Sequence, residues 1–176
     1  SRMEVKIDSP DPNTHAGEII CRGTNLMLGY YKNPEATAQI IDKDGWLHTG
    51  DLGTMDNQGY VTIRGRSKNL LLNSSGHNIY PEEIESKLNN MLYVSESLIV
   101  LQNDKLVALI YPDFDEAFAN GLQQPDIEKA MENNRIELNL QLPSYSQITK
   151  VKIHFEEFEK TAKKSIKRFM YQEAKG

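Results

Sequence analysis

Hydrophobic positions in the first third of the chain come in short runs that glycines and polar turns interrupt. Residues 18–22 form a β-compatible run around two isoleucines, with a glycine on either side. Residues 52–55 and 60–63 are two further apolar runs, and the Asp-Asn-Gln-Gly sequence between them is typical of a hairpin turn. A short helix should begin at Asn33-Pro34, because proline suits the first helical position. The pattern predicts a small antiparallel β unit.

After about residue 70 the elements become longer. Apolar residues at helical spacing predict one helix over residues 82–90 and a second that Asp126 caps. Residues 97–101 and 106–111 should form two strands joined by a turn at Asn103-Asp104. The remaining expected elements are a short buried strand, one more strand and a C-terminal helical turn, at residues 70–72, 151–155 and 166–172. The predicted fold class is α+β, with a small antiparallel β subdomain followed by a compact α+β domain.

The composition narrows the class of protein. A hydrophobic fraction of 39% and a charged fraction of 26% are typical of a soluble globular protein. The net charge of −5 argues against a nucleic-acid binder. No transmembrane run and no signal sequence are visible, so a cytoplasmic location is expected.

Metal and disulfide chemistry are not expected either. Cys21 is the single cysteine, which excludes a disulfide framework. The four histidines lack the short spacings that place two imidazoles on one metal. We therefore predict no metal site in this chain.

Three segments carry the candidate chemistry, and they occur in a fixed order. The first begins with Gly-Glu-Ile at residues 17–19 and ends with Asp-Gly-Trp-Leu-His-Thr-Gly-Asp at residues 44–51. The second joins Gly-Arg-Ser-Lys at 65–68 to Gly-His-Asn-Ile-Tyr-Pro-Glu-Glu-Ile-Glu at 76–85. The third is the lysine-rich run at 160–168. Together they closely resemble the adenylate-forming superfamily of acyl-CoA synthetases, luciferases and nonribosomal peptide adenylation domains, over almost the whole chain.

The resemblance implies a domain division and a fragment. Residues 1–64 would be the end of an N-terminal adenylation domain, 65–69 a hinge and 70–176 a C-terminal lid domain. The hinge run and the 76–85 stretch look most like bacterial long-chain fatty acid ligases. The phosphate loop, acyl tunnel and magnesium ligand of such enzymes lie upstream of the matching region, so we expect this chain to be inactive alone.

The resemblance assigns Asp51 and Arg66 to the nucleotide. Asp51 matches an aspartate that accepts both ribose hydroxyls, and a carboxylate on a glycine turn at a strand end suits that role. Arg66 matches a residue that also contacts the ribose, where a planar guanidinium donates several fixed hydrogen bonds. The alternatives are an ordinary turn aspartate and a solvated interdomain arginine.

Lys68 and Gly76 match positions that serve the domain rotation and coenzyme A. Lys68 occupies the hinge position, where one residue's backbone rotation swings the C-terminal domain. Gly76 matches a glycine whose backbone lines the pantetheine channel, a use that suits a residue without a side chain. A loop glycine that only provides a positive φ is the alternative.

The third segment departs from the family pattern. In the family this region reads proline, lysine, threonine, two variable residues, glycine, the catalytic lysine, a branched apolar residue and, two further on, arginine. Aligning Thr161, Ile166 and Arg168 with it puts Ser165 at the catalytic position and Lys164 at the glycine position. The resemblance implies that a lysine ammonium is needed there, because adenylation builds negative charge between the carboxylate and the α-phosphate.

A serine hydroxyl cannot supply that charge, so another lysine would have to do so. Lys163, Lys164 and Lys167 all lie within two residues of Ser165, each on a flexible four-carbon stem. We take Lys164 as the predicted catalytic residue. The alternative is that the lysine run is a solvated basic tail.

The expected function is that of the C-terminal portion of an ATP-dependent fatty acyl-CoA synthetase. A fatty acid, ATP with Mg²⁺, and CoA would be its substrates and cofactors through the parent enzyme. The runner-up is a non-catalytic interaction domain that docks CoA, phosphopantetheine or a partner protein, which Ser165 favours. A third reading is that the basic tail binds an anionic membrane or nucleic acid, against which the acidic remainder argues. Peripheral membrane contact is left open.

Overall fold

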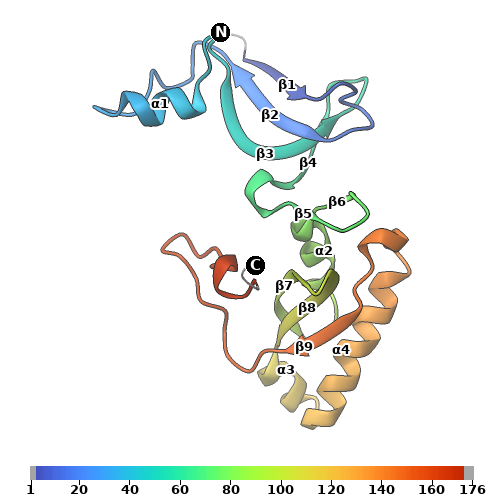
Figure 1. Cartoon of the computed structure of the whole chain (residues 1–176). Coiled ribbons are helices and arrows are strands. Elements are labelled where there is room, and N and C mark those ends of the chain that lie inside the picture. The colour runs from blue at the N-terminus through green and yellow to red at the C-terminus, as the bar shows by residue number, and fades with distance from the viewer. Residues whose placement is uncertain (1–2, 173–176) are drawn as a thin grey trace. The chain divides into compact units, whose positions relative to one another are not determined.

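The computed structural model describes residues 3–172, and the chain divides into two compact units that meet between Asn69 and Leu70. The first unit, drawn in blue to green in Figure 1, is an antiparallel four-stranded sheet in the order β1-β2-β3-β4 with one short helix. Its elements are β1 (Glu4–Asp8), β2 (Gly17–Arg22), α1 (Pro34–Ile40), β3 (Leu47–Met55), β4 (Val61–Arg66) and the 3₁₀ turn η1 (Ser67–Asn69). The antiparallel β unit expected from the sequence is confirmed, and β1 is an additional strand.

The second unit is α+β, as expected. Its elements are β5 (Leu71–Leu72), β6 (Asn78–Ile79), α2 (Pro81–Leu88), β7 (Val94–Gln102), β8 (Lys105–Pro112), α3 (Phe114–Ala119), α4 (Gln124–Asn139), η2 (Ser144–Ser146), β9 (Lys150–Ile153) and η3 (Arg168–Met170). The main sheet has the order β7-β8-β9, in which β7 and β8 are antiparallel and β9 runs parallel to β8.

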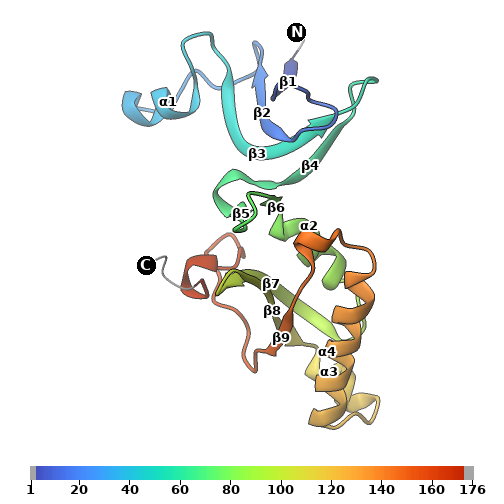
Figure 2. The ribbon, with the colours of Figure 1, turned by 45° about the vertical axis from the view of Figure 1, so that its right-hand side comes forward.

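Alternation along β7 and β8 gives this sheet two apolar faces. Ile99, Ala108 and Ile110 face a core that includes side chains of α2 and α4. Leu98, Val100, Val107 and Leu109 form a second cluster on the opposite face. The side chains that cover the second cluster come from the C-terminal segment: Phe158, Ile166 and Tyr171. In Figures 1 and 2 this segment, in red, lies on the side of the sheet away from α4.

The turn between β7 and β8 is the two-residue hairpin expected from the sequence. Asn103 and Asp104 have φ values of 48° and 60°, the left-handed geometry that such hairpins require. Gln102 and Lys105 pair on either side of it. Asn and Asp tolerate this conformation better than other non-glycine residues, which is why the dipeptide predicts the turn.

Three local expectations are wrong. Gln123, not Asp126, caps α4: Asp126 lies at the third helical position and accepts a hydrogen bond from the Gln123 N–H at 2.9 Å. Leu72 is 59% exposed, because a two-residue strand can turn only one of its side chains inward. The C-terminal helical turn is limited to the three residues of η3.

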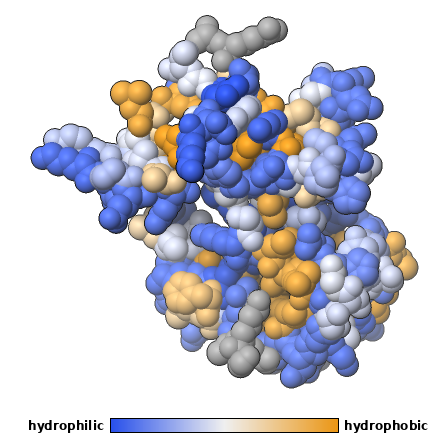
Figure 3. Space-filling model, turned by 45° about the horizontal axis from the view of Figure 1, so that its top comes forward, coloured by the Kyte–Doolittle hydropathy of each residue, from blue (hydrophilic) through white to orange (hydrophobic). Residues whose placement is uncertain are grey.

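The surface of the molecule is mostly polar, as the composition predicts. The face drawn in Figure 3 is largely hydrophilic, and apolar side chains gather into patches on it. Within residues 3–172, no helix combines the length and the apolar character needed to cross a bilayer.

Candidate active site

The first candidate site lies in the first unit, where β3 and β4 pair. Asp51 and Arg66 stand directly opposite each other across the two strands. Arg66 Nε lies 2.9 Å from Asp51 Oδ1, and the two side chains are 55% and 33% exposed. The structure therefore brings together the two residues expected at the ribose and leaves both accessible to a ligand. Their role in nucleotide binding stays a prediction.

A bulge in β3 directs Asp51. Gly50 has a φ of 72°, a conformation that favours glycine, and its N–H donates to Glu18 Oε1 at 2.8 Å. The Asp51 N–H donates to Thr49 Oγ1 at 3.1 Å, and that hydroxyl donates to the Ile19 carbonyl at 2.7 Å. The glycine turn was expected at a strand end, but it lies inside β3, where the pairing with β2 shifts register. Bulges of this kind re-aim neighbouring side chains.

Glu18 is a residue of this site to which the sequence analysis assigned no role. One of its carboxylate oxygens accepts the Gly50 N–H, and the other lies 2.7 Å from His48 Nδ1. The hydrogen bond with Glu18 raises the pKa of His48 above its ordinary value of 6.5. The Gly17-Glu18-Ile19 run is part of the first motif segment, but the contacts of Glu18 could not be predicted, because its partners are 30 residues or more away along the chain.

The second candidate site is the turn at residues 161–165 in the second unit, which we call the lysine turn. The Lys164 N–H donates to the Thr161 carbonyl at 2.9 Å, and the Thr161 N–H donates to the Ser165 carbonyl at 2.8 Å. Lys160 and Ile166 form an antiparallel bridge just outside it. Lys164 has a φ of 61°, so the turn is a tight three-residue hairpin whose last loop residue is left-handed. Glycine is the ordinary residue at that position, which is the place where the family pattern has one.

The lysines of this segment fall into two groups. Lys160 lies 2.7 Å from Glu96 Oε1, and Lys167 lies 3.5 Å from Glu159 Oε2. Lys163 and Lys164 are exposed, and among the described residues neither forms an ion pair. These two ammonium groups, at the tip of the lysine turn, are therefore the ones that an anionic ligand can approach without displacing a carboxylate.

Ser165 is exposed beside them. Its N–H lies 3.3 Å from the Thr161 hydroxyl, which helps to close the turn. A neutral hydroxyl there adds a hydrogen-bonding group but no charge. The structure places the lysine turn in the open, and the identity of its catalytic member stays a prediction.

Gly76 lies in a turn with the same hydrogen-bond pattern as the lysine turn. The Gly76 N–H donates to the Asn73 carbonyl at 3.0 Å, and the Asn73 N–H donates to the His77 carbonyl at 3.3 Å. Gly76 has a φ of 79°, and a side chain added there would meet no atom within 4 Å. The positive φ accounts for the glycine, and the open space leaves its backbone accessible. The neighbouring His77 ring stacks on Tyr145, with 4.5 Å between ring centroids.

Lys68 lies in η1 at the end of the first unit. Its side chain is exposed, and it is the middle residue of that 3₁₀ turn. Such a position can change its backbone angles without losing a buried side chain. That residues 65–69 act as a hinge stays a prediction.

A buried ion pair joins α2 to the C-terminal segment. Glu85 is 7% exposed, and its Oε2 pairs with Arg168 Nη2. Its Oε1 accepts the Ile99 N–H of β7 at 2.7 Å. Burial raises the pKa of Glu85 to about 7, although Arg168 and the Ile99 N–H favour the charged form. Glu85 lies in the buried stripe of α2 with Ile84 and Leu88, a placement that the sequence analysis did not predict.

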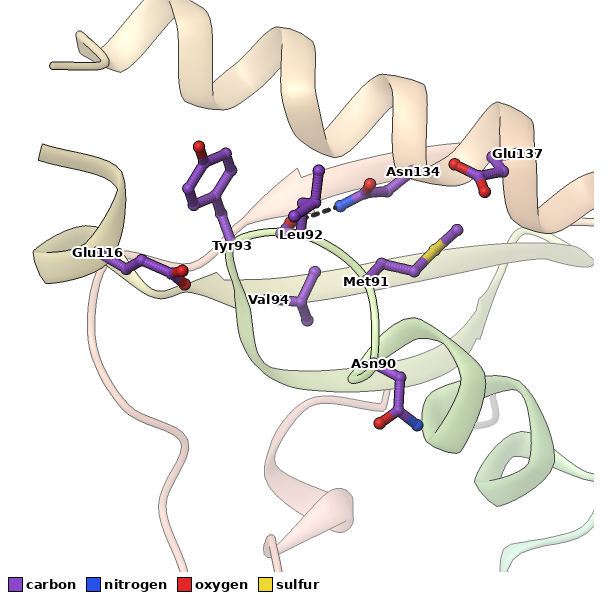
Figure 4. A pocket seen from close by; sticks show the side chains of 8 residues that line it. All are labelled: Asn90, Met91, Leu92, Tyr93, Val94, Glu116, Asn134 and Glu137. Carbon is purple, nitrogen blue, oxygen red and sulfur yellow. Dashed lines mark hydrogen bonds between the residues drawn. The ribbon is translucent and has the colours of Figure 1, made fainter. Parts of the chain in front are cut away.

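An open cavity of about 460 Å³ lies elsewhere in the second unit, between the end of α2, the start of β7, α3 and α4. Figure 4 shows its lining, including Glu116 and Glu137, with the Asn134 amide donating to the Leu92 carbonyl at 2.9 Å. None of the residues expected at the active site lines it. The cavity is therefore no part of either candidate site.

Comparisons with known proteins agree with the sequence motifs. The family model of the AMP-binding enzyme C-terminal domain matches residues 68–174. The 2-methylpropanoate–CoA ligase CCL4 of Humulus lupulus is 33% identical over 181 residues, covering 97% of this chain and 31% of that ligase. A long-chain-fatty-acid–CoA ligase of Salmonella typhimurium is 48% identical over 86 residues, covering 47% of this chain and 15% of that ligase.

A solved structure has a similar fold. ATP-bound MatB from Rhodopseudomonas palustris matches with a TM-score of 0.68 and 26% identity, over 96% of this chain and 33% of MatB. The chain thus spans about a third, or less, of the length of these relatives. The resemblance to adenylate-forming acyl-CoA synthetases is confirmed. The chain belongs to the family of the AMP-binding enzyme C-terminal domain.

Proposed function

We propose that this chain is the C-terminal portion of an ATP-dependent fatty acyl-CoA synthetase. In the first half-reaction a carboxylate attacks the α-phosphate of Mg-ATP to give acyl-AMP and pyrophosphate. In the second, CoA thiolate attacks the acyl carbon and AMP leaves. The observation that carries the proposal is the lysine turn, which presents two ammonium groups without ion-pair partners among the described residues, next to the position where the family pattern has its catalytic lysine.

Within this reaction we assign Lys164 to the α-phosphate region during adenylation. Its ammonium would stabilise the negative charge that develops as the acyl–phosphate bond forms, and a preorganised cation of this kind contributes about 10²–10³ in rate. Lys163 is the second choice, because it is equally exposed. Lys167 is less suited, since its ammonium faces Glu159.

The remaining assignments concern the nucleotide, the hinge and CoA. Asp51 would accept the ribose hydroxyls while Arg66 donates to the ribose, for which their exposed carboxylate and guanidinium groups are suited. Lys68 would be the hinge residue between the two half-reactions. The Gly76 backbone would border the pantetheine channel, which its open surroundings allow. The Mg²⁺ ligand would come from the upstream region of the enzyme.

The test is release of AMP and pyrophosphate from Mg-ATP, oleate and CoA. The chain alone should release neither product above a heat-killed control, whereas a longer protein with the upstream adenylation region should release both. Lys164→Ala in the longer protein should abolish most of the first half-reaction, with Lys129→Ala on α4 as a matched surface control. Product release by the chain alone would show that the upstream region is not required.

The acyl group is the least constrained part of the proposal. The Salmonella relative is named for long-chain fatty acids, whereas the Humulus relative is named for 2-methylpropanoate. We propose a long-chain fatty acid, because the 48% identity to the Salmonella ligase exceeds the 33% identity to the Humulus ligase, although over a shorter stretch. Competition between oleate and 2-methylpropanoate in the longer protein would decide between them.

A second candidate function is a non-catalytic domain that docks CoA or phosphopantetheine. Ser165 favours it, because the position that carries the catalytic lysine in the family pattern has no charge here. This function predicts binding of CoA to the longer protein with no pyrophosphate release under any substrate. Binding that is lost on Lys164→Ala together with absent turnover would support it over the synthetase.

A further inference from the structure

The lysine turn is the tip of a segment with little regular structure of its own. Residues 157–172 contain one isolated bridge and the 3₁₀ turn η3. Apolar anchors fix the segment to the sheet: Phe158, 2% exposed, packs with Ile166 and Tyr171 on the second cluster of β7 and β8. Residues 161–165 themselves are all exposed. The position of the tip therefore depends on what holds the two limbs beside it.

Two ion pairs hold these limbs. On the first limb, Lys160 lies 2.7 Å from Glu96 at the start of β7. On the second, Arg168 pairs with Glu85 of α2, and both side chains are largely buried, at 15% and 9% exposure. The lysine turn lies between the two anchored residues, so the ion pairs restrain it from both sides.

Glu85 can reach the C-terminal segment because it stands at the edge of the sheet. In the order β7-β8-β9, strand β7 has no second neighbour among residues 3–172, and Ile99 presents its N–H at that open edge. Glu85 accepts this N–H with one oxygen and Arg168 with the other. One carboxylate thus ties together a helix on one face of the sheet, the edge strand, and the segment that covers the other face.

Stability alone does not account for the ion pair between Glu85 and Arg168. Arg168 Nη1 is buried and makes no hydrogen bond among the described residues. Burying a charge pair costs desolvation energy that its mutual attraction often fails to recover, and such pairs are retained in some proteins because they fix one geometry. A buried guanidinium with an unused donor beside an otherwise apolar contact fits that description.

We propose that Glu85 and Arg168 are positioning residues that hold the lysine turn in place for the reaction proposed above. The role rests on the proposed function: a cation that acts on a developing charge must be held within about half an ångström of its productive position. The pair supplies that restraint at a distance from the ammonium groups. Neither residue need touch the substrates.

Trypsin cleavage after Lys163 and Lys164 measures the restraint directly in the intact chain. Glu85→Gln and Arg168→Met should each raise the rate of this cleavage at least tenfold, because the second limb is released. Glu159→Gln, which removes the exposed pair with Lys167 in the same segment, is the matched control and should stay within twofold of wild type. Unchanged amide hydrogen exchange in α4 would show that the variants are folded. Cleavage within twofold of wild type in both folded variants would overturn the proposal.

The longer protein separates this role from the proposed reaction. Glu85→Gln should lower the kcat of adenylation at least tenfold with little change in the KM for ATP, and the Glu159→Gln control should match wild type. A released turn with unchanged kcat would refute the positioning role. A wild-type protein without any turnover would instead refute the synthetase assignment, while the cleavage result would still report whether the pair holds the turn.

Discussion

Replacing Lys164 by glycine separates the two things this residue does in the lysine turn. Its backbone has a φ of 61°, and its side chain is an exposed ammonium. A non-glycine residue in the left-handed region costs about 1–2 kcal/mol, whereas glycine adopts it freely but gains about 0.4–1 kcal/mol of unfolded-state freedom. Lys164→Gly should therefore raise the free energy of unfolding by up to about 1 kcal/mol while it removes the charge.

The matching turn at Gly76 provides an internal reference. Gly76 has the same place in the same hydrogen-bond pattern, at a φ of 79°, with no atom near an added side chain. Gly76→Ala should lower the free energy of unfolding by up to about 1 kcal/mol, the opposite sign to Lys164→Gly. Denaturant unfolding followed by far-ultraviolet circular dichroism measures both, because most of the helical residues lie in this unit.

The rate of adenylation should depend on the charge of the side chain at position 164 and not on the backbone conformation there. In the longer protein, Lys164→Gly and Lys164→Ala should both slow adenylation by about 10²–10³. Transfer of the acyl group from preformed acyl-AMP to CoA should be much less affected, and Lys163→Ala should have a small effect on either step. If both Lys164 variants adenylate at the wild-type rate, the assignment of the cation to Lys164 is wrong. If Lys164→Gly destabilises the chain, the account of the turn is wrong.

Four further substitutions test the rest of the structure. Because the hydrogen bond with Glu18 raises the pKa of His48, the stability that this pair contributes is present below about pH 6.5 and is lost as the pH rises through the folded-state pKa. Glu18→Gln should therefore flatten the pH dependence of the free energy of unfolding, measured by the fluorescence of the single tryptophan. Burial of Glu85 raises its pKa from 4.5 to about 7, so the folded state holds the proton more tightly and the second unit should lose at most about 3 kcal/mol of stability as the pH rises from 4.5 to about 7. This loss should be absent in Glu85→Gln and is measurable by circular dichroism. A side chain on Gly17 would clash with the Asp8 carbonyl oxygen of β1, so Gly17→Ala should cost about 1–3 kcal/mol in thermal unfolding. Gly59→Asn, with open surroundings and a φ that Asn tolerates, should cost little.

The sequence pattern was enough to predict those elements whose conformation is determined by residues close together in the chain. The apolar spacing of α4 predicts the buried residues Ile127, Met131 and Leu138, and Asn103-Asp104 predicts its hairpin from two residues alone. In contrast, β1 was missed, because its alternating residues become a strand only by pairing with β2. The start of α4 was misplaced because Asp126 can serve either as a cap or as the third residue of a capping box.

Among the candidate site residues, too, the sequence predicted some features and not others. Asp51 and Arg66 could be named from motif resemblance, but their pairing depends on the register of β3 and β4, which shifts between Leu52 and Gly53. Glu85 was the opposite case: its residue type was visible, yet its partner Arg168 lies 83 residues away. The one sequence signal that could have identified Glu85 as a buried residue is the position of a carboxylate within the apolar stripe of a helix.

The two matching turns explain why the lysine turn needs anchors at all. With Gly76 at the left-handed position, the first turn can adopt its conformation without strain. With Lys164 there, the second turn adopts the same conformation against the preference of its own residue, so something outside the turn must hold it. The apolar contacts of Phe158 and the pairing of Arg168 with Glu85 are the contacts that fix its limbs. A strained lysine between anchored limbs is what one expects where the direction of an ammonium group matters more than the stability of the turn that carries it.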